Sequence, residues 1–252
     1  MTNVLQFDRV ERKKLKYRKT GLLIMAALFL ELIWTVYSFS DASRIWQGTE
    51  YYAMIYMIPI LNVIFFPLTL GILASRLCDM EHKGNNLKLL CTLEKRHEIY
   101  NTKVWEGMKY VFWMTLSQLL IVLGMGGVYH YVQPIPWGNL LFFLLEIFVV
   151  SVSIFLLQLL LSLFLENQMI PLVIGLLGSF SGLFTLYVPQ IRRMTIWGYY
   201  VILAPVEYWW DKESGAYGVN GGTCNWLGIL VFLGIGATLY LAGRILFEKK
   251  EV

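Results

Sequence analysis

Charged residues are scarce in this 252-residue sequence, and their scarcity excludes an ordinary soluble domain. Only 15% of the residues are Asp, Glu, Lys or Arg, whereas 57% are hydrophobic, and the mean hydropathy is +0.58. A typical soluble globular chain carries about 25% charged residues. The composition instead indicates a protein that lies in a membrane.

The motifs of a self-sufficient enzyme are also missing. The chain has no GxxxxGK[ST] and therefore no P-loop with which to hydrolyse a nucleotide. The GSFSG stretch at 178–182 does not fit GxSxG, because Phe180 stands at its centre, and does not fit GxSG, because Ser179 stands where glycine is needed. Cys78 and His82 lie one helical turn apart, but two candidate ligands do not make a metal site. No catalytic residue and no metal ligand is predicted.

Long apolar runs are what the sequence has instead. A helix rises about 1.5 Å per residue, so about 20 apolar residues cross a hydrocarbon layer about 30 Å thick. Six such runs lie at 21–39, 52–75, 104–128, 140–165, 170–188 and 226–247. Because they leave no room for a separate soluble domain, we expect one all-α membrane domain over residues 1–252 with six transmembrane helices.

Basic residues are distributed unevenly around these runs. Seven Lys or Arg lie between Arg9 and Lys19, six lie in the loop 76–103 and three follow residue 243, against four in the loops of the other side. The positive-inside rule therefore predicts that both termini and the 76–103 loop are cytosolic. The three cysteines then fall on both sides of the membrane, which argues against a disulfide framework. A cleaved signal peptide is the alternative for the first run, but that run is overlong, contains Glu31 and is followed by no A-x-A site, so we expect a retained helix.

Two segments outside the runs are predicted to lie against the membrane. Residues 1–20 are basic with apolar side chains between the charges, which favours an amphipathic segment on the inner surface; the alternative is a disordered basic tail. Residues 189–225 contain six aromatic residues within fourteen, among them Trp197, Tyr208 and Trp209. Because this outer stretch is too short to span and is interrupted by proline, we expect a re-entrant or interfacial helical hairpin. The alternative is an ordinary belt of aromatic side chains at the membrane surface.

Two carboxylates fall in the interior of the apolar runs, Glu31 in the first and Glu146 in the fourth, whereas Glu106 lies near the inner end of the third and can snorkel. A charge at the centre of a bilayer costs about 2.5–3.5 kcal/mol on insertion scales, so such residues usually face a bundle interior or a watery cavity. Glu31 and Glu146 are therefore candidates for contact with a polar or cationic substrate or with a partner subunit. The alternative is a structural role, in which hydrogen bonds lock the spans together with Asn62 as a partner.

Small residues form a ridge along the fifth run. Gly175, Gly178 and Gly182 recur at helical spacing, and the last two have the spacing of a GxxxG motif. In membranes such ridges allow the backbones of two helices to approach closely. We expect a packing role for these glycines.

The loop 76–103 carries an apolar stripe. Met80, Gly84, Leu87 and Cys91 recur at spacings of four, three and four, which predicts one face of a short amphipathic helix. Lysine and asparagine side chains mostly occupy the other faces. A cytosolic loop needs no such stripe unless it packs on the membrane surface, on the protein's own helix ends or in the groove of another protein.

This loop carries a resemblance to a known family. The stretch SRLCDMEHKGNNLKLLCTLEKRHEIYNTKVWEG is similar to the first cytosolic loop of ABC transporter permeases of the type-2 exporter class. In that family an acidic residue, a small run with Gly, Leu-Leu, a turn and a basic residue precede a Lys that opens the third span. The matching positions are Asp79, Glu81, Gly84, Leu87, Leu90, Arg96 and Lys103, whereas Leu93 stands where many relatives have Pro in the turn. The stretches ENQMIPLVIGLLGSFSGLF and YVILAPVEYWW resemble the lantibiotic-immunity subgroup of these permeases.

The resemblance implies a transport subunit and not an enzyme. It implies that the chain pairs with a second permease, as a homodimer or a heterodimer, and binds a separate ABC ATPase subunit. ATP and magnesium would belong to that ATPase, while this chain would bind no cofactor and no nucleic acid. The apolar stripe would pack into a groove of the ATPase, with charges such as Lys83 and Lys88 fixing its register. Closure of the ATPases would then tilt the first three spans.

The implied activity is lantibiotic immunity, in which an amphipathic peptide is expelled from a bacterial plasma membrane. Glu31, Glu146 and the outer aromatic residues would contact that peptide. Alternatives are a permease that exports another peptide or a drug, an intramembrane protease, and a signalling or scaffold protein. The protease alternative is weakened because His130, its sole candidate histidine outside the cytosolic loop, lies in an outer connection.

Overall fold

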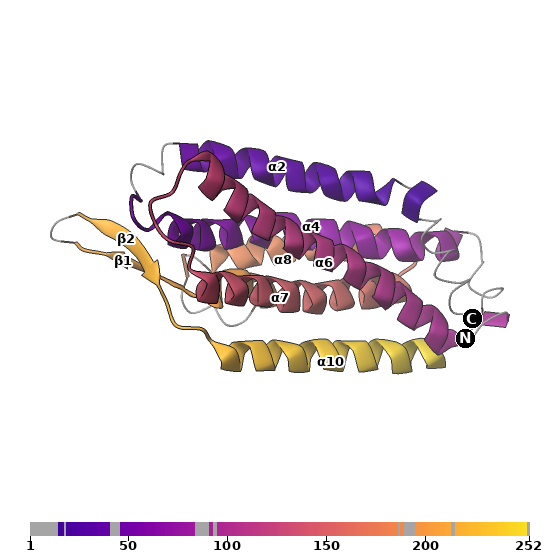
Figure 1. The fold of residues 1–252 in the computed structure, drawn as a ribbon. Coiled ribbons are helices and arrows are strands. Elements are labelled where there is room, and N and C mark those ends of the chain that lie inside the picture. Colours follow the sequence, from indigo (N-terminus) through magenta and orange to yellow (C-terminus); the bar gives the residue numbers. More distant parts are fainter. Residues whose placement is uncertain are drawn as a thin grey trace.

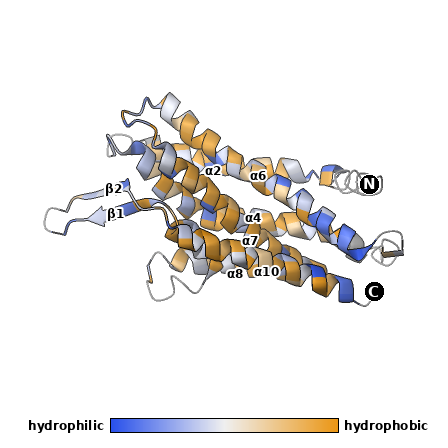
Figure 2. Ribbon diagram, turned by 60° about the horizontal axis from the view of Figure 1, so that its bottom comes forward, coloured by the Kyte–Doolittle hydropathy of each residue, from blue (hydrophilic) through white to orange (hydrophobic). Residues whose placement is uncertain are grey.

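The computed structural model describes residues 15–17, 19–40, 46–83, 91–92, 95–185, 187–188, 195–212 and 215–250. Six helices of 16 residues or more form a bundle (Figure 1). They are α2 (Thr20–Ser40), α4 (Glu50–Lys83), α6 (Arg96–Val128), α7 (Trp137–Phe164), α8 (Met169–Phe184) and α10 (Trp226–Lys249). Apolar residues dominate the helices along their length, and hydrophilic residues gather near their ends (Figure 2).

The two ends of the bundle differ. Leu15–Tyr17 and the end of α10 lie at one end, called the terminal end below, together with the last turns of α4 and the first turns of α6 (Figure 1). A two-stranded sheet projects from the other end, called the hairpin end. Helix α6 crosses the bundle diagonally, from α10 at the terminal end to α2 at the hairpin end (Figure 1). α4 and α7 are the most buried spans.

Among the described residues, five helices are long and apolar enough to cross a membrane. The predicted fifth span, 170–188, is not confirmed, because α8 has only 16 residues. At about 1.5 Å per residue it extends about 24 Å, less than a hydrocarbon layer about 30 Å thick. Its last turn closes on itself, since the Thr185 hydroxyl and backbone amide both donate to the Gly182 carbonyl. The apolar composition continues past the point where the helix stops.

The predicted loop 76–103 is largely an extension of two spans. α4 continues to Lys83 and α6 begins at Arg96, so the helices reach well beyond the apolar runs that predict them. Cys91 and Thr92 are helical, and residues 84–90 and 93–94 lie outside the described residues. The loop that connects the two spans is therefore much shorter than the apolar runs indicate.

The helical hairpin predicted for residues 189–225 is wrong for its second half, where the structure has two strands. Two short helical segments, η1 (Ile196–Gly198) and α9 (Tyr199–Ile202), pack against the bundle, with Tyr200 fully buried. The chain then forms an antiparallel pair of strands, β1 (Val206–Trp210) and β2 (Tyr217–Gly221), in the register Val206↔Gly221. The sequence VEYWW is rich in the aromatic and β-branched residues that strands favour.

Side chains anchor the base of the β-hairpin to the bundle. The Asn139 amide, in the first turn of α7, donates to the Pro205 carbonyl at 2.7 Å and to the Gly222 carbonyl at 3.2 Å. Tyr208 stacks on Tyr56 of α4 with ring centroids 5.5 Å apart. These contacts orient the hairpin by holding both its strands at the point where they leave the bundle.

The glycine ridge of α8 lies against two partners. Gly178 lies directly under the ring of Trp197 from η1, where a Cβ atom would overlap the ring. A Cβ on Gly182 would lie 2.7 Å from the Val63 side chain of α4. Because both positions are closed to any side chain, the ridge permits α8 to pack between α4 and η1.

We expect the Gly178→Val variant to lose about 1–3 kcal/mol of stability, as overpacked interiors do. Gly234→Val is the matched control, because a Cβ at Gly234 of α10 meets open space. Thermal unfolding of the purified protein in detergent measures the difference, and combining Gly178→Val with Trp197→Ala should restore part of the loss. Equal losses in the two single variants would contradict the packing role.

Candidate functional site

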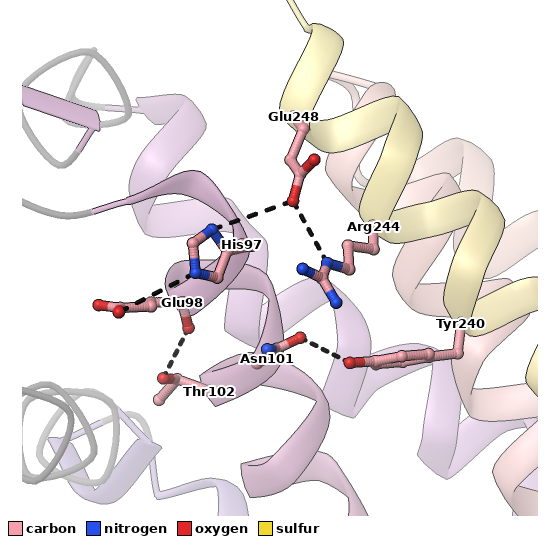
Figure 3. A network of polar contacts seen from close by, with 7 residues as sticks. All are labelled: His97, Glu98, Asn101, Thr102, Tyr240, Arg244 and Glu248. Atoms are coloured by element: carbon pink, nitrogen blue, oxygen red, sulfur yellow. Dashed lines mark hydrogen bonds and ion pairs between the residues drawn. The ribbon is translucent and has the colours of Figure 1, made fainter. Parts of the chain in front are cut away.

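The terminal end of the bundle holds a network that joins α6 to α10 (Figure 3). The Arg96 guanidinium, in the first turn of α6, donates to the Glu248 carbonyl at 2.9 Å and to the Lys250 carbonyl. The last carbonyls of a helix have no partner within the helix and carry its partial negative charge. Arg96 therefore caps α10 from a neighbouring helix.

Further polar contacts surround this cap (Figure 3). The Tyr240 hydroxyl donates to the Asn101 Oδ1 atom at 2.9 Å, and Arg244 Nε lies 3.2 Å from Glu248 Oε1. His97 Nδ1 lies 4.0 Å from the same carboxylate. Exposed ion pairs contribute little stability individually, so these contacts mainly orient the two helices relative to each other. Arg96, His97, Asn101, Tyr240, Arg244 and Glu248 are called the α6–α10 clamp below.

Aromatic packing lies beside the clamp. The Tyr100 ring is fully buried and packs against Tyr240 and Phe247, with centroids 5.7 and 6.3 Å apart. It also covers Gly243 so closely that a Cβ there would overlap the Tyr100 hydroxyl. Close packing makes α6 and α10 one unit at this end, because a well-packed interface resists small displacements.

The end of α10 also reaches α7. Lys250 Nζ donates to the Leu163 carbonyl at 2.8 Å and lies 5.5 Å from the centroid of the Phe164 ring. Both residues belong to the last turn of α7, whose carbonyls likewise lack helical partners. The end of α10 thus contacts α6 through Arg96 and α7 through Lys250.

Lys103 ties the two arms of the loop together. Its side chain is fully buried, and Nζ donates to the Leu77 carbonyl of α4 at 2.6 Å. A buried ammonium group is stable only when it is hydrogen-bonded or paired. The position that opens the third span in the sequence pattern therefore fixes α6 to α4 from within the bundle.

The predicted coupling residues are distributed as follows. Arg96 and Lys103 lie at the terminal end in the contacts above, and Asp79 is half-buried near the end of α4. Glu81 and Lys83 belong to the last turn of α4, and their side chains lie outside what the structure describes. Gly84, Leu87, Lys88 and Leu90 lie outside the described residues altogether.

Sequence reasoning missed the part of the site that comes from α10. The basic residues after position 243 entered the analysis as markers of topology, and Tyr240 and Glu248 did not enter it. A signal was present, because a helix that ends in EKK offers carbonyls and charges to whatever packs beside it. Nothing in the sequence indicates which helix that is.

A second group of polar residues lies within the bundle. Gln118 Nε2 of α6 donates to Glu31 Oε2 of α2 at 3.2 Å, and both side chains are fully buried. Glu31 Oε1 and Gln118 Oε1 have no hydrogen-bond partner among the described residues. Glu31 is thus bonded to Gln118 and not to Asn62, whose amide has no hydrogen-bond partner in the described part of the chain.

Glu146 is the more isolated carboxyl group. It lies on α7, is fully buried, and neither of its oxygens has a hydrogen-bond partner among the described residues. A buried polar atom without a hydrogen-bond partner costs free energy, so a polar group that reached Glu146 would lower that cost by bonding to it. Across the described ranges, no three or more His, Cys, Asp or Glu residues gather as metal ligands would.

The outer aromatic residues divide between two environments. Trp197 covers the glycine ridge and serves packing. Tyr208 and Trp209 are 49% and 44% exposed on the β-hairpin, where Trp209 lies over Gly218 of the opposite strand. Of these three predicted contact residues, Tyr208 and Trp209 are the exposed ones.

Comparison with protein families identifies the class of this protein. The family model described as ABC-2 family transporter protein matches residues 9–182, which is more than half of the chain. The match extends from the basic N-terminal segment through α2, α4, α6 and α7 into α8. Neither the curated proteins nor the solved structures give a match. The chain belongs to the ABC-2 transporter family and is a multi-pass membrane permease of the ABC exporter type.

We expect the Lys103→Met variant to lose about 1.5–3 kcal/mol of stability, because a hydrogen bond from a charged group in the interior is lost. Lys249→Met is the control, since Lys249 is exposed in the last turn of α10. The measurement is thermal unfolding of each purified variant in the same detergent. If Lys103→Met unfolded at the same temperature as the wild type, the hydrogen bond between α4 and α6 would contribute no stability.

Proposed function

We propose that this chain is the permease subunit of a bacterial ABC exporter that expels amphipathic antimicrobial peptides of the lantibiotic type from the plasma membrane. Membership of the ABC-2 family carries the proposal. A separate ABC ATPase subunit supplies the energy, and ATP and magnesium are bound there, since this chain has no GxxxxGK[ST]. The chain itself binds no cofactor. Export of another peptide or of a drug is the alternative substrate assignment.

The terminal end of the bundle faces the cytosol in this proposal, with both termini inside. The excess of Lys and Arg at that end supports this orientation. The segment between α4 and α6 then projects toward the ATPase. Its apolar stripe, which includes Leu87 and Leu90, packs into a groove of that subunit, and the charges beside it set the register.

Movement of this segment travels into the bundle through the contacts at the terminal end. Arg96 transfers it to α10, Lys250 transfers it to α7 and Lys103 transfers it to α4. The tilt then involves α4, α6, α7 and α10 together, whereas the sequence alone predicts movement of the first three spans. Packed interfaces switch between discrete arrangements, so a rigid unit of this kind can transmit a push.

The permease works in a pair, as a homodimer or with a sister permease. α8 supports this arrangement because it is apolar and exposes a row of large side chains on the face opposite its glycine ridge. Two bundles joined in this way enclose a path between them. The exposed Tyr208 and Trp209 lie at the hairpin end, where an amphipathic peptide in the outer leaflet meets the protein.

Leu87→Asp should abolish co-purification of the permease with the ATPase encoded beside it, because a charge placed in an apolar groove is costly. Membrane insertion should be unchanged. Val132→Asp is the control, since Val132 is 70% exposed in the connection at the hairpin end. Intact association of Leu87→Asp with the ATPase would rule out docking through the stripe.

Glu146→Gln should lower resistance to a cationic peptide by about tenfold or more, as expected when a hydrogen bond to a charged group is lost. Survival of cells that co-express permease and ATPase is measured across a peptide dilution series. Glu166→Gln, exposed in the connection between α7 and α8 at the terminal end, is the control. Unchanged resistance would make Glu146 a structural residue, and no protection by the wild-type pair would overturn the substrate assignment.

A further inference from the structure

The boundary between α2 and α6 contains two cavities, which together form what is called the α2–α6 seam below. An apolar groove of about 560 Å³ lies along it, lined among others by Met25, Leu28 and Phe29 of α2 and by Leu120, Gly124 and Val128 of α6. Ser117 and Tyr129 are the polar residues in its lining. The groove lies where the two helices approach each other toward the hairpin end (Figure 1).

The second cavity lies toward the terminal end and is basic. It measures about 410 Å³ and is lined by Lys16, Lys19, Gly21, Leu22 and Tyr110. Both lysines are exposed, and neither makes an ion pair in the described part of the chain. They lie immediately before the first turn of α2, so their ammonium groups stand at the edge of a membrane-spanning helix.

The two cavities lie one after the other along α2 and α6. Leu22 and Met25 are one turn apart on α2, and Tyr110 and Ser117 are two turns apart on α6. From Leu22 to Leu32 the helix rises about 15 Å, which is half of a hydrocarbon layer about 30 Å thick. A basic site at the membrane edge thus continues into an apolar groove that reaches the middle of the bilayer.

We propose that the α2–α6 seam binds one anionic phospholipid from the leaflet at the terminal end. Its phosphate contacts Lys16 and Lys19, and one acyl chain lies along Leu22 and Met25 into the groove. Charge complementarity selects this occupant, because basic residues at a membrane surface attract anionic lipids. A cationic peptide would be repelled by the same two lysines.

Such a lipid completes the packing of α2. Only 22% of the most apolar window of α2 is buried inside the protein, the same share as in α10, but α10 is held by the clamp and by Lys250. The one side-chain hydrogen bond that joins α2 to α6 within the described residues is that between Glu31 and Gln118. A bound acyl chain adds apolar contacts between the two helices along the seam.

The test uses the full-length chain in nanodiscs that contain equal amounts of phosphatidylglycerol and phosphatidylcholine with the same acyl chains. After extraction, native mass spectrometry counts the lipid that each protein retains. We expect the wild type to retain phosphatidylglycerol preferentially. The Lys16→Gln/Lys19→Gln variant should bind it roughly 30-fold more weakly, as expected for the loss of two basic contacts at a membrane surface. Lys249→Gln, exposed on α10, should behave as the wild type.

A second pair of variants tests the apolar half. A Cβ at Gly124 or at Gly127 meets open space, but only Gly124 lines the groove. Gly124→Leu should therefore displace the acyl chain and reduce retention of the lipid, whereas Gly127→Leu should not. Thermal unfolding confirms that both variants are folded, so a loss of lipid cannot be a loss of fold.

Three results of the retention experiments would overturn the proposal. They are equal retention of the two lipids by the wild type, unchanged retention by the lysine variant, and unchanged retention by Gly124→Leu. Glycerol phosphate, which has no acyl chain, should not compete with the lipid. Competition by it would mean that the seam is a site for a free phosphate and not for a phospholipid.

Discussion

The terminal end of the bundle depends on one kind of interaction, in which basic side chains bind helix carbonyls. Arg96 binds the last carbonyls of α10, Lys250 binds that of Leu163 in α7, and Lys103 binds that of Leu77 in α4. Helix C-terminal carbonyls carry partial negative charge, and their bonds to cations are stronger in a low-dielectric setting. Backbone acceptors therefore join α4, α6, α7 and α10 at this end, in addition to the Glu248 carboxylate of the clamp, although the Leu77 carbonyl lies within α4 and not at its end.

The sequence predicts the parts of the fold that depend on length and composition. Five apolar runs become helices of spanning length because twenty apolar residues have few other stable arrangements in a bilayer. Composition fails at α8 and at the β-hairpin. Where the helix ends depends on the turn at Gly182, and the strands VEYWW and YGVNG are defined by their pairing with each other. Hydropathy alone predicts neither the end of α8 nor the pairing of the two strands.

The sequence predicts the basic side chains of the site but not the groups that accept their hydrogen bonds. The family pattern selects Arg96 and Lys103, because it contains a basic residue after the turn and a Lys that opens the third span. Their acceptors are backbone carbonyls, which every residue possesses, so no pattern identifies Leu77 or the end of α10 as the partner. Gln118 shows the same limit, since an amide in an apolar run becomes the partner of Glu31 only after α2 and α6 have packed.

The contacts that α6 makes with α10 and with α2 differ in strength, whereas at the hairpin end α6 also packs closely on α4, where Gly126 lies against Tyr51. At the terminal end, Arg96, the packed Tyr100 ring and the other clamp residues join α6 to α10. Gln118 lies 22 residues further along, about 33 Å of helix, and holds α2 by one hydrogen bond of 3.2 Å whose partners each have an unpaired oxygen. A single bond of this kind is worth about 0.5–3 kcal/mol, so it breaks before the clamp does. In the proposed mechanism, a tilt of the α6–α10 unit would therefore loosen the contact between α6 and α2 at Gln118, beside the apolar groove that Ser117 lines, before it broke the clamp.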